Sequence, residues 1–206
     1  MPAIDVWLTV VHGVTDTTAK DFHRSEKVFV HVPLKFKVKK FVLNKDQTKA
    51  ILGTDGKLTL TGGPTEFDHD LPAGTGSRVA RPTTVKETDL GGLHVFYVLD
   101  FDTPGLEGGI CLRIDDQIDP IIFVNQKANA SLLSLTKGAR GILEHEIGHA
   151  FGLKDTTRSD TLMNGIVSSD GSDAGTSLSQ DEMAAIASSR LLGLAAAAEE
   201  AHRNSR

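Results

Sequence analysis

Apolar side chains recur at every second position in the first part of the chain. In residues 4–10 this alternation has the two-residue period of a strand with one buried face. Residues 34–38 repeat it, with lysines between the apolar positions, and predict a second strand whose outer face is charged. A turn signal at residues 54–57 leads into a short strand at 57–61. Residues 93–101 are apolar at odd and even positions alike, which predicts a central strand covered on both faces.

Two more strands are predicted at residues 108–113 and 120–125. Residues 17–32 have the apolar spacing of a helix, whereas the valines near their end favour a strand. Ser131 is the expected N-cap of a later helix, because apolar residues follow it and its hydroxyl can accept a bond from a free backbone amide. We expect this helix to continue through Leu143 into the histidines that follow, although two glycines weaken it.

The composition restricts both the fold and the partners. A chain of 206 residues allows one domain with a sizeable core, or at most two small subdomains around a cleft. The net charge is -5 and the basic residues are dispersed, so neither nucleic acid nor a membrane is an expected partner. No apolar run approaches the eighteen or so residues of a membrane span. Cys111 is the single cysteine, so no internal disulfide can form and any zinc site must use histidine and carboxylate ligands. We also expect a monomer.

Residues 145–155, with the sequence HEIGHAFGLKD, concentrate groups that bind metal. His145 and His149 are separated by about 40° of rotation and roughly 6 Å of rise on a helix, so both imidazoles can reach one ion. Glu146 directly follows the first histidine and can take a proton from a water molecule beside that ion. Gly152 suits a sharp turn after the helix, which would bring Asp155 back toward the metal. The pattern predicts a zinc site with Glu146 as its catalytic base.

Chance is a weak explanation for this motif. A His-Glu-x-x-His match by itself arises in roughly one sequence in a hundred of this composition. With glycine and a ligand-type residue at the two later positions, the frequency falls to about one in several thousand. The alternative is a surface helix whose histidines are only solvated or packed in the core.

The long motif resembles that of the metzincin zinc endopeptidases, His-Glu-x-x-His-x-x-Gly-x-x-His, which is followed by a turn containing methionine. This chain has Asp155 at the third ligand position, as in the snapalysin-type members. The methionine turn is matched by DTLMNG at residues 160–165, which implies that Met163 lies under the metal. Residues 178–183 resemble the start of the family's C-terminal helix. The matching motifs cover about residues 140–192, and the remainder fits in outline.

The resemblance implies both a fold and an activity. The fold is α+β, with a five-stranded mixed twisted sheet, an active-site helix, a Met-turn and a C-terminal helix in a single catalytic domain over residues 1–206. Residues 1–152 would form its upper subdomain, and residues 153–206 the smaller C-terminal one. The activity is zinc-dependent hydrolysis of peptide bonds in a protein or peptide. The resemblance also implies secretion, although residues 1–5 lack the features of a secretory signal.

Two further groups of candidate residues follow. The resemblance implies that an edge strand lines the cleft and pairs with an extended substrate. The candidate residues for this contact are Gly109, Ile110, Cys111 and Leu112. A structural calcium ion or a second zinc ion could be bound by Asp68, His69 and Asp70, for which a solvated loop is the simpler expectation.

Two other functions stay open at this point. A binding module could keep the metal fold without turnover, although it would have no need of Glu146. A zinc hydrolase that acts on a non-protein amide or ester would use the same ligands as a peptidase.

Overall fold

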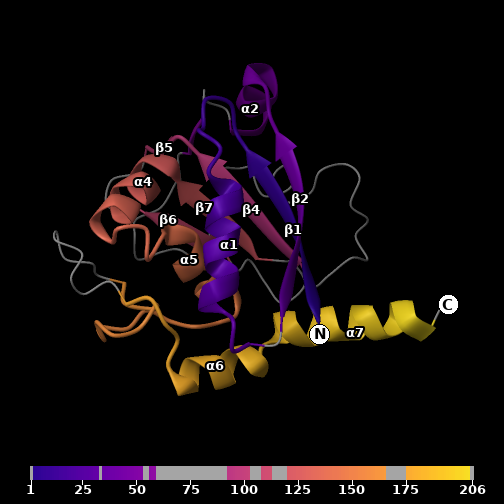
Figure 1. The fold of residues 1–206 in the computed structure, drawn as a ribbon. Helices are drawn as coiled ribbons and strands as arrows, with labels where there is room; N and C mark the ends of the chain where they lie inside the picture. Colours follow the sequence, from indigo (N-terminus) through magenta and orange to yellow (C-terminus); the bar gives the residue numbers. More distant parts are fainter. Residues whose placement is uncertain are drawn as a thin grey trace.

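The computed structural model describes residues 2–32, 34–52, 56–58, 92–102, 108–112, 120–165 and 175–204. The strands are β1 (Ala3–Val10), β2 (Lys35–Val42), β3 (Lys57–Leu58), β4 (Gly92–Val98), β5 (Asp100–Phe101), β6 (Gly109–Leu112) and β7 (Ile121–Asn125). The helices are α1 (Thr18–Val28), α2 (Lys45–Leu52), α4 (Gln126–Leu135), α5 (Ile142–Ala150), α6 (Gln180–Ala187) and α7 (Arg190–Asn204). Helices α2 and α7 lie at opposite ends of the main sheet (Figure 1).

The main sheet has the strand order β2-β1-β4-β7-β6. Strand β1 runs parallel to β2 and β4, and β4 runs parallel to β7. Strand β6 is antiparallel to β7 and forms one edge of this sheet. The predicted five-stranded mixed sheet is therefore confirmed. Strands β3 and β5 pair with each other in a second, two-stranded sheet.

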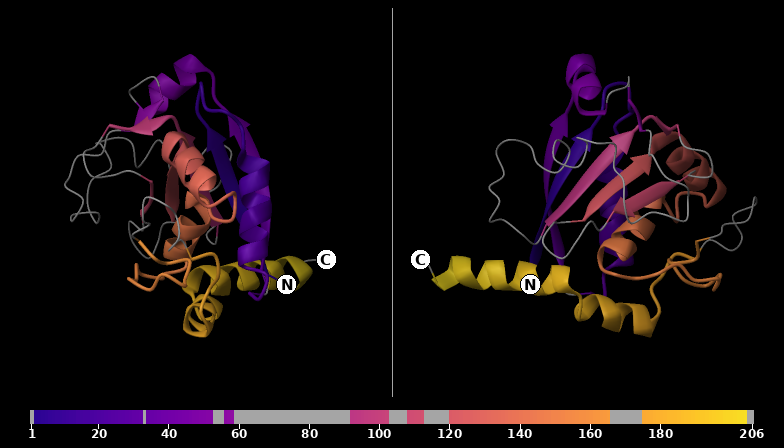
Figure 2. Two further views of the ribbon diagram at one scale, coloured as in Figure 1. Left: turned by 60° about the vertical axis from the view of Figure 1, so that its left-hand side comes forward. Right: turned by 180° about the vertical axis from the view of Figure 1, so that it is seen from behind.

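Helices α1, α4 and α5 pack on one face of the main sheet. In the view from behind in Figure 2, the sheet is nearer to the viewer than these helices. In this core Val6, Val95 and Val124 of the sheet meet Phe22 of α1 and Ile147 of α5. Parallel strands need covering on both faces, and a second apolar cluster occupies the opposite face. Helix α5, which carries the histidine motif, is thereby held between α1 and strands β6 and β7.

The helix that carries the motif begins later than predicted. Ser131 is not an N-cap, because it lies within α4 and its hydroxyl donates to the carbonyl of Lys127. The N-cap of α4 is Asn125, whose side chain accepts a backbone N–H bond. Lys137 and Gly138 then have φ values of 51° and 80°. Since left-handed residues cannot continue a right-handed helix, α4 and α5 are two helices instead of one.

Two strand predictions also change. The valines near the end of residues 17–32 form no strand. Val28 is the last residue of α1, and Val30 is exposed in the turn that follows. The long central strand is two strands, since the chain bends at Leu99 and Asp100–Phe101 pairs with β3. The apolar pattern of these segments is compatible with either structure, so the contacts made in the folded protein decide which one forms.

Some predictions fall outside the residues that the structure describes. The candidate calcium ligands Asp68, His69 and Asp70 belong to this group, as do residues 59–61 of the short third strand. Within the described ranges, no helix is long and apolar enough to span a membrane.

Candidate metal centre

Helix α5 begins with its first amides satisfied. The N–H of Gly141 donates to Oε2 of Glu144 at 3.1 Å, and the N–H of Ile142 donates to Oδ1 of Asn129 at 2.9 Å. A helix start leaves four such amides without helical partners, so these bonds define where α5 begins. The bond to Asn129 also joins α5 to α4.

Helix α5 ends in a Schellman motif at Gly152, which has a φ of 96°. Its N–H donates to the carbonyl of His149 at 2.8 Å, and the N–H of Leu153 donates to the carbonyl of Gly148 at 3.1 Å. Glycine suits this position because it adopts positive φ without steric cost. The motif turns the chain sharply, and Asp155 follows within three residues, as the sequence predicts.

The three predicted metal ligands meet at one point. The Nε2 atoms of His145 and His149 are 3.1 Å apart, and Oδ1 of Asp155 lies 3.2 Å from the first and 3.5 Å from the second. Two ligands that are each about 2.1 Å from a tetrahedral zinc ion lie about 3.4 Å apart. The donor spacing therefore fits one face of a zinc tetrahedron. Among the residues that the structure describes, no other group of three histidine, cysteine or acidic side chains has a metal-binding arrangement.

Backbone carbonyls hold the far nitrogen of each imidazole. Nδ1 of His145 is 3.0 Å from the carbonyl of Leu162, and Nδ1 of His149 is 2.9 Å from the carbonyl of Leu153. A proton on Nδ1 that is donated to a carbonyl leaves the lone pair of Nε2 for a metal. Both contacts therefore favour the tautomer that a zinc ligand requires.

Arg140 links the start of α5 to the loop behind the site. It is only 3% exposed, and its Nη2 donates to the carbonyl of Asn164 at 2.8 Å while lying 3.2 Å from Nδ1 of His145. The guanidinium of Arg140 therefore contacts both His145, a predicted ligand, and Asn164, which follows Met163. The sequence analysis missed Arg140, because it belongs to no motif and lies in a turn.

The loop after α5 closes on itself and presents Asp155. The N–H of Thr156 donates to the carbonyl of Met163 at 2.8 Å, and the N–H of Gly165 donates back to Thr156 at 3.3 Å. Met163 is fully buried against α5, where a Cβ at Gly148 would clash with its sulfur. A Cβ at Gly165 would lie 2.8 Å from Cγ of Asp155, so this glycine gives room to the carboxylate.

Glu146 lies on the side of α5 that faces β6, and it is only 5% exposed. A Cβ on Gly109 would be 2.7 Å from both Cγ and Oε1 of Glu146. Burial raises the pKa of the Glu146 carboxyl, the two histidines lower it, and Asp155 raises it again. The pKa of this carboxyl group therefore depends on the charges of the three predicted ligands.

The three ligands also attract one another. Burial alone would lower the pKa of His149, but the carboxylates of Asp155 and Glu146 outweigh it and raise this pKa to about 9. The bonds from His145 and His149 in turn lower the pKa of the Asp155 carboxyl. Protons and a metal ion would compete for the same atoms. The side chain of Asp155 is 61% exposed, so water and a substrate can reach the group from that side.

The candidate substrate-binding residues Gly109, Ile110, Cys111 and Leu112 make up the edge strand β6. Cys111 packs on the core that contains α5, whereas Ile110 and Leu112 belong to the cluster on the opposite face. Gly109 makes room for Glu146 and Ile142 of α5, because a Cβ at this position would clash with both side chains. Contact between β6 and a substrate stays a prediction.

Solved structures that resemble this molecule include the following two. Metalloproteinase-II from Bacteroides fragilis matches with a TM-score of 0.53 and 11% identity, over 90% of this chain and 52% of that one. Archaemetzincin from Methanopyrus kandleri matches with a TM-score of 0.53 and 16% identity, over 89% of this chain and 93% of that one. This chain has the fold of a metallopeptidase.

This metallopeptidase fold is shared without close sequence similarity. The sequence matches no protein-family model, and no curated protein matches it. The chain also spans only about half the length of the Bacteroides protein. Because one fold can carry different chemistries, the activity has to be argued from the site itself.

Proposed function

We propose that this protein is a zinc-dependent endopeptidase of the metzincin type, with aspartate as the third ligand. The observation that carries this proposal is the convergence of His145, His149 and Asp155 within 3.1–3.5 Å beside the buried Glu146. The metallopeptidase fold supports it, since two proteins with that fold are a metalloproteinase and an archaemetzincin. The substrate would be a protein or a peptide.

The charges in the site suit a zinc dication. Two neutral imidazoles and the carboxylate of Asp155 would hold the ion, and the carboxylate of Glu146 would complete the neutralisation. When bound, zinc polarises a substrate carbonyl and lowers the pKa of water to about 7. The exposed side of Asp155 leaves a path along which water and the substrate can enter.

Glu146 would move the proton in this reaction. Its carboxylate takes the proton from the attacking water, which forms the new bond to the peptide carbonyl carbon. The same carboxyl group then donates that proton to the leaving amine as the peptide bond breaks. Gly109 of β6 lies against Glu146, so the carboxyl group that makes both transfers is packed beside the edge strand. The outer edge of β6 would pair with the extended substrate next to this group.

Hydrolysis of casein and of a fluorogenic peptide tests the proposal. We expect the zinc-loaded protein to be active and the Glu146→Gln variant to lose at least about 100-fold in turnover while keeping one equivalent of zinc. The matched control is Glu200→Gln, which removes an exposed carboxylate on α7 and should be as active as the wild type.

Three results would contradict the proposal. An active Glu146→Gln variant would remove the assigned base. A protein that binds zinc but hydrolyses nothing would be a binding module. A protein that hydrolyses an ester or a non-protein amide but no peptide would be a different zinc hydrolase.

A further inference from the structure

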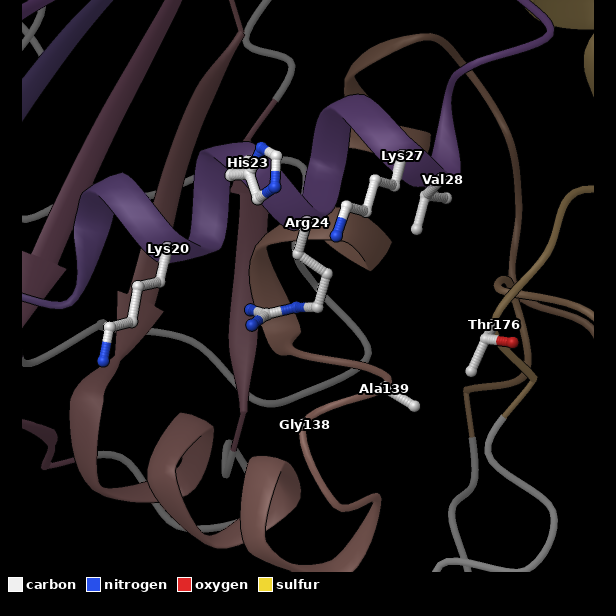
Figure 3. A pocket seen from close by; sticks show the side chains of 8 residues that line it. All are labelled: Lys20, His23, Arg24, Lys27, Val28, Gly138, Ala139 and Thr176. Carbon is white, nitrogen blue, oxygen red and sulfur yellow. The ribbon is translucent and has the colours of Figure 1, made fainter.

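A cavity of about 470 Å³ lies between α1 and the turn that joins α4 to α5. The side chains of Lys20, His23, Arg24 and Lys27 line it from α1, and Gly138 and Ala139 line it from the turn (Figure 3). No acidic side chain is among its lining residues in the described part of the chain. The predicted metal ligands do not line it either, so this cavity is separate from the metal centre.

Helix geometry places these positive charges together. Positions 20, 23, 24 and 27 share one face of α1, because residues three, four and seven apart lie above one another on a helix. Within the described residues, neither Lys20 nor Lys27 forms an ion pair with a carboxylate. A bound anion would therefore meet two lysine charges that no carboxylate of the described residues neutralises.

Arg24 lines the cavity, but its guanidinium is paired with two carboxylates. Its Nη2 donates to Oδ1 of Asp21 at 2.7 Å, and its Nε lies 2.5 Å from Oε1 of Glu144. These carboxylates are 1% and 0% exposed, whereas the side chain of Arg24 is 14% exposed. The two buried carboxylates more than offset the single charge of Arg24, and they hold its guanidinium in place. The positive charge that a ligand in the cavity can meet therefore comes from Lys20 and Lys27.

We propose that this cavity binds a small phosphate-type anion. Its volume is in the range of about 300–1,000 Å³ that is usual for small-molecule sites. A concave surface lined by one sign of charge concentrates ions of the opposite sign, and arginine and lysine are the usual partners of phosphate oxygens. The cations lie within two turns of a single helix face, from Lys20 to Lys27, whereas a longer polyanion would need positive charges along its whole length.

Amide NMR of the zinc-loaded protein, titrated with inorganic phosphate, tests this inference. We expect saturable shifts at residues 20–28 and at Gly138 and Ala139, and none at His145 or His149. Replacing the pair Lys20→Ala and Lys27→Ala should weaken the affinity at least about tenfold, because both unpaired charges are lost. The matched control is the pair Lys35→Ala and Lys37→Ala on β2, which removes the same charge from exposed positions outside the cavity. Its affinity should stay within about twofold of the wild type.

The Ala139→Trp variant separates a cavity from general electrostatic attraction. It fills the space with every charge kept, and Ala139 is an exposed turn residue, so we expect a folded protein that does not bind phosphate. The inference is overturned if Ala139→Trp binds normally, or if both lysine pairs lose affinity equally. Shifts confined to His145 and His149 would place the phosphate at the metal and would also overturn it. A tetraglutamate peptide that binds more tightly than phosphate would rule out a small anion as the ligand.

Discussion

A methyl group at position 109 should impair the proposed active site while the protein stays folded. The Cβ of Gly109→Ala would lie 2.5 Å from Cγ2 of Ile142 and 2.7 Å from Cγ and Oε1 of Glu146. Ordinary contacts begin at 3.4 Å, so these neighbours would have to move by about 0.7–0.9 Å. Both side chains are buried, at 6% and 5% exposure, which leaves them little space in which to move.

The expected magnitudes follow from this overlap. An extra methyl group in a packed site costs about 1–3 kcal/mol in the free energy of unfolding, and we expect about 1–2 kcal/mol because β6 is an edge strand that can shift outward. A displacement of about 1 Å can cost about 100-fold in rate when it moves a catalytic group. We therefore expect kcat/KM for peptide hydrolysis to fall about 30- to 100-fold.

Gly108→Ala provides a matched control in the adjacent position. Its Cβ would lie 3.4 Å from Cδ1 of Ile142, which is an ordinary contact, so stability and turnover should match the wild type. Neither glycine has positive φ, so the two variants differ in their contacts and not in backbone strain. Peptide hydrolysis, zinc content and urea unfolding, followed by fluorescence of the single buried tryptophan Trp7, would be measured for both. Full activity of Gly109→Ala, or an equal loss in Gly108→Ala, would refute the reasoning.

Three further predictions concern the buried charges and the metal. Arg24→Met leaves the carboxylates of Asp21 and Glu144 buried without their cation, and should lower the free energy of unfolding in urea by about 3 kcal/mol. Burial, followed by the negative charge of Asp21 and the hydrogen bond to it, raises the pKa of Tyr97, so ultraviolet titration of this single tyrosine should show no tyrosinate at pH 10. The stability that neutral Tyr97 contributes is complete below pH 10 and is lost as pH rises through its raised folded-state pKa. Asp155→Ala should weaken zinc binding by more than about 100-fold in competition with a fluorescent chelator.

Exposed residues of the same types serve as controls for these changes. Arg158 pairs with Asp160 at 2.9 Å on the surface, so Arg158→Met should leave the unfolding midpoint unchanged. Asp160→Ala should bind zinc as the wild type does. An equal effect at the two arginines, tyrosinate formation near pH 10 in the folded protein, or unchanged zinc affinity of Asp155→Ala would contradict the corresponding prediction.

The local parts of the fold could be predicted because they depend on spacing along the chain. Alternation marked β1, and the four-residue spacing of His145 and His149 placed both on one side of a helix whatever surrounds it. The break between α4 and α5 was missed, because Lys137 adopts a positive φ that non-glycine residues rarely have. The capping residue Asn125 was missed as well, since it directly follows an apolar run that predicts only a strand.

The sequence by itself thus determined the chemistry that is available: two imidazoles, a neighbouring carboxylate and a glycine turn within eleven residues. Only the tertiary structure decided that Asp155 lies 3.2 Å from His145, that Arg140 stands behind that histidine, and that Gly109 makes room for Glu146. The same holds for the basic cavity, because its lining residues on α1 lie more than a hundred positions before Gly138, Ala139 and Thr176. Contacts within a helix follow from its regular geometry, whereas contacts between distant segments depend on how the whole core packs.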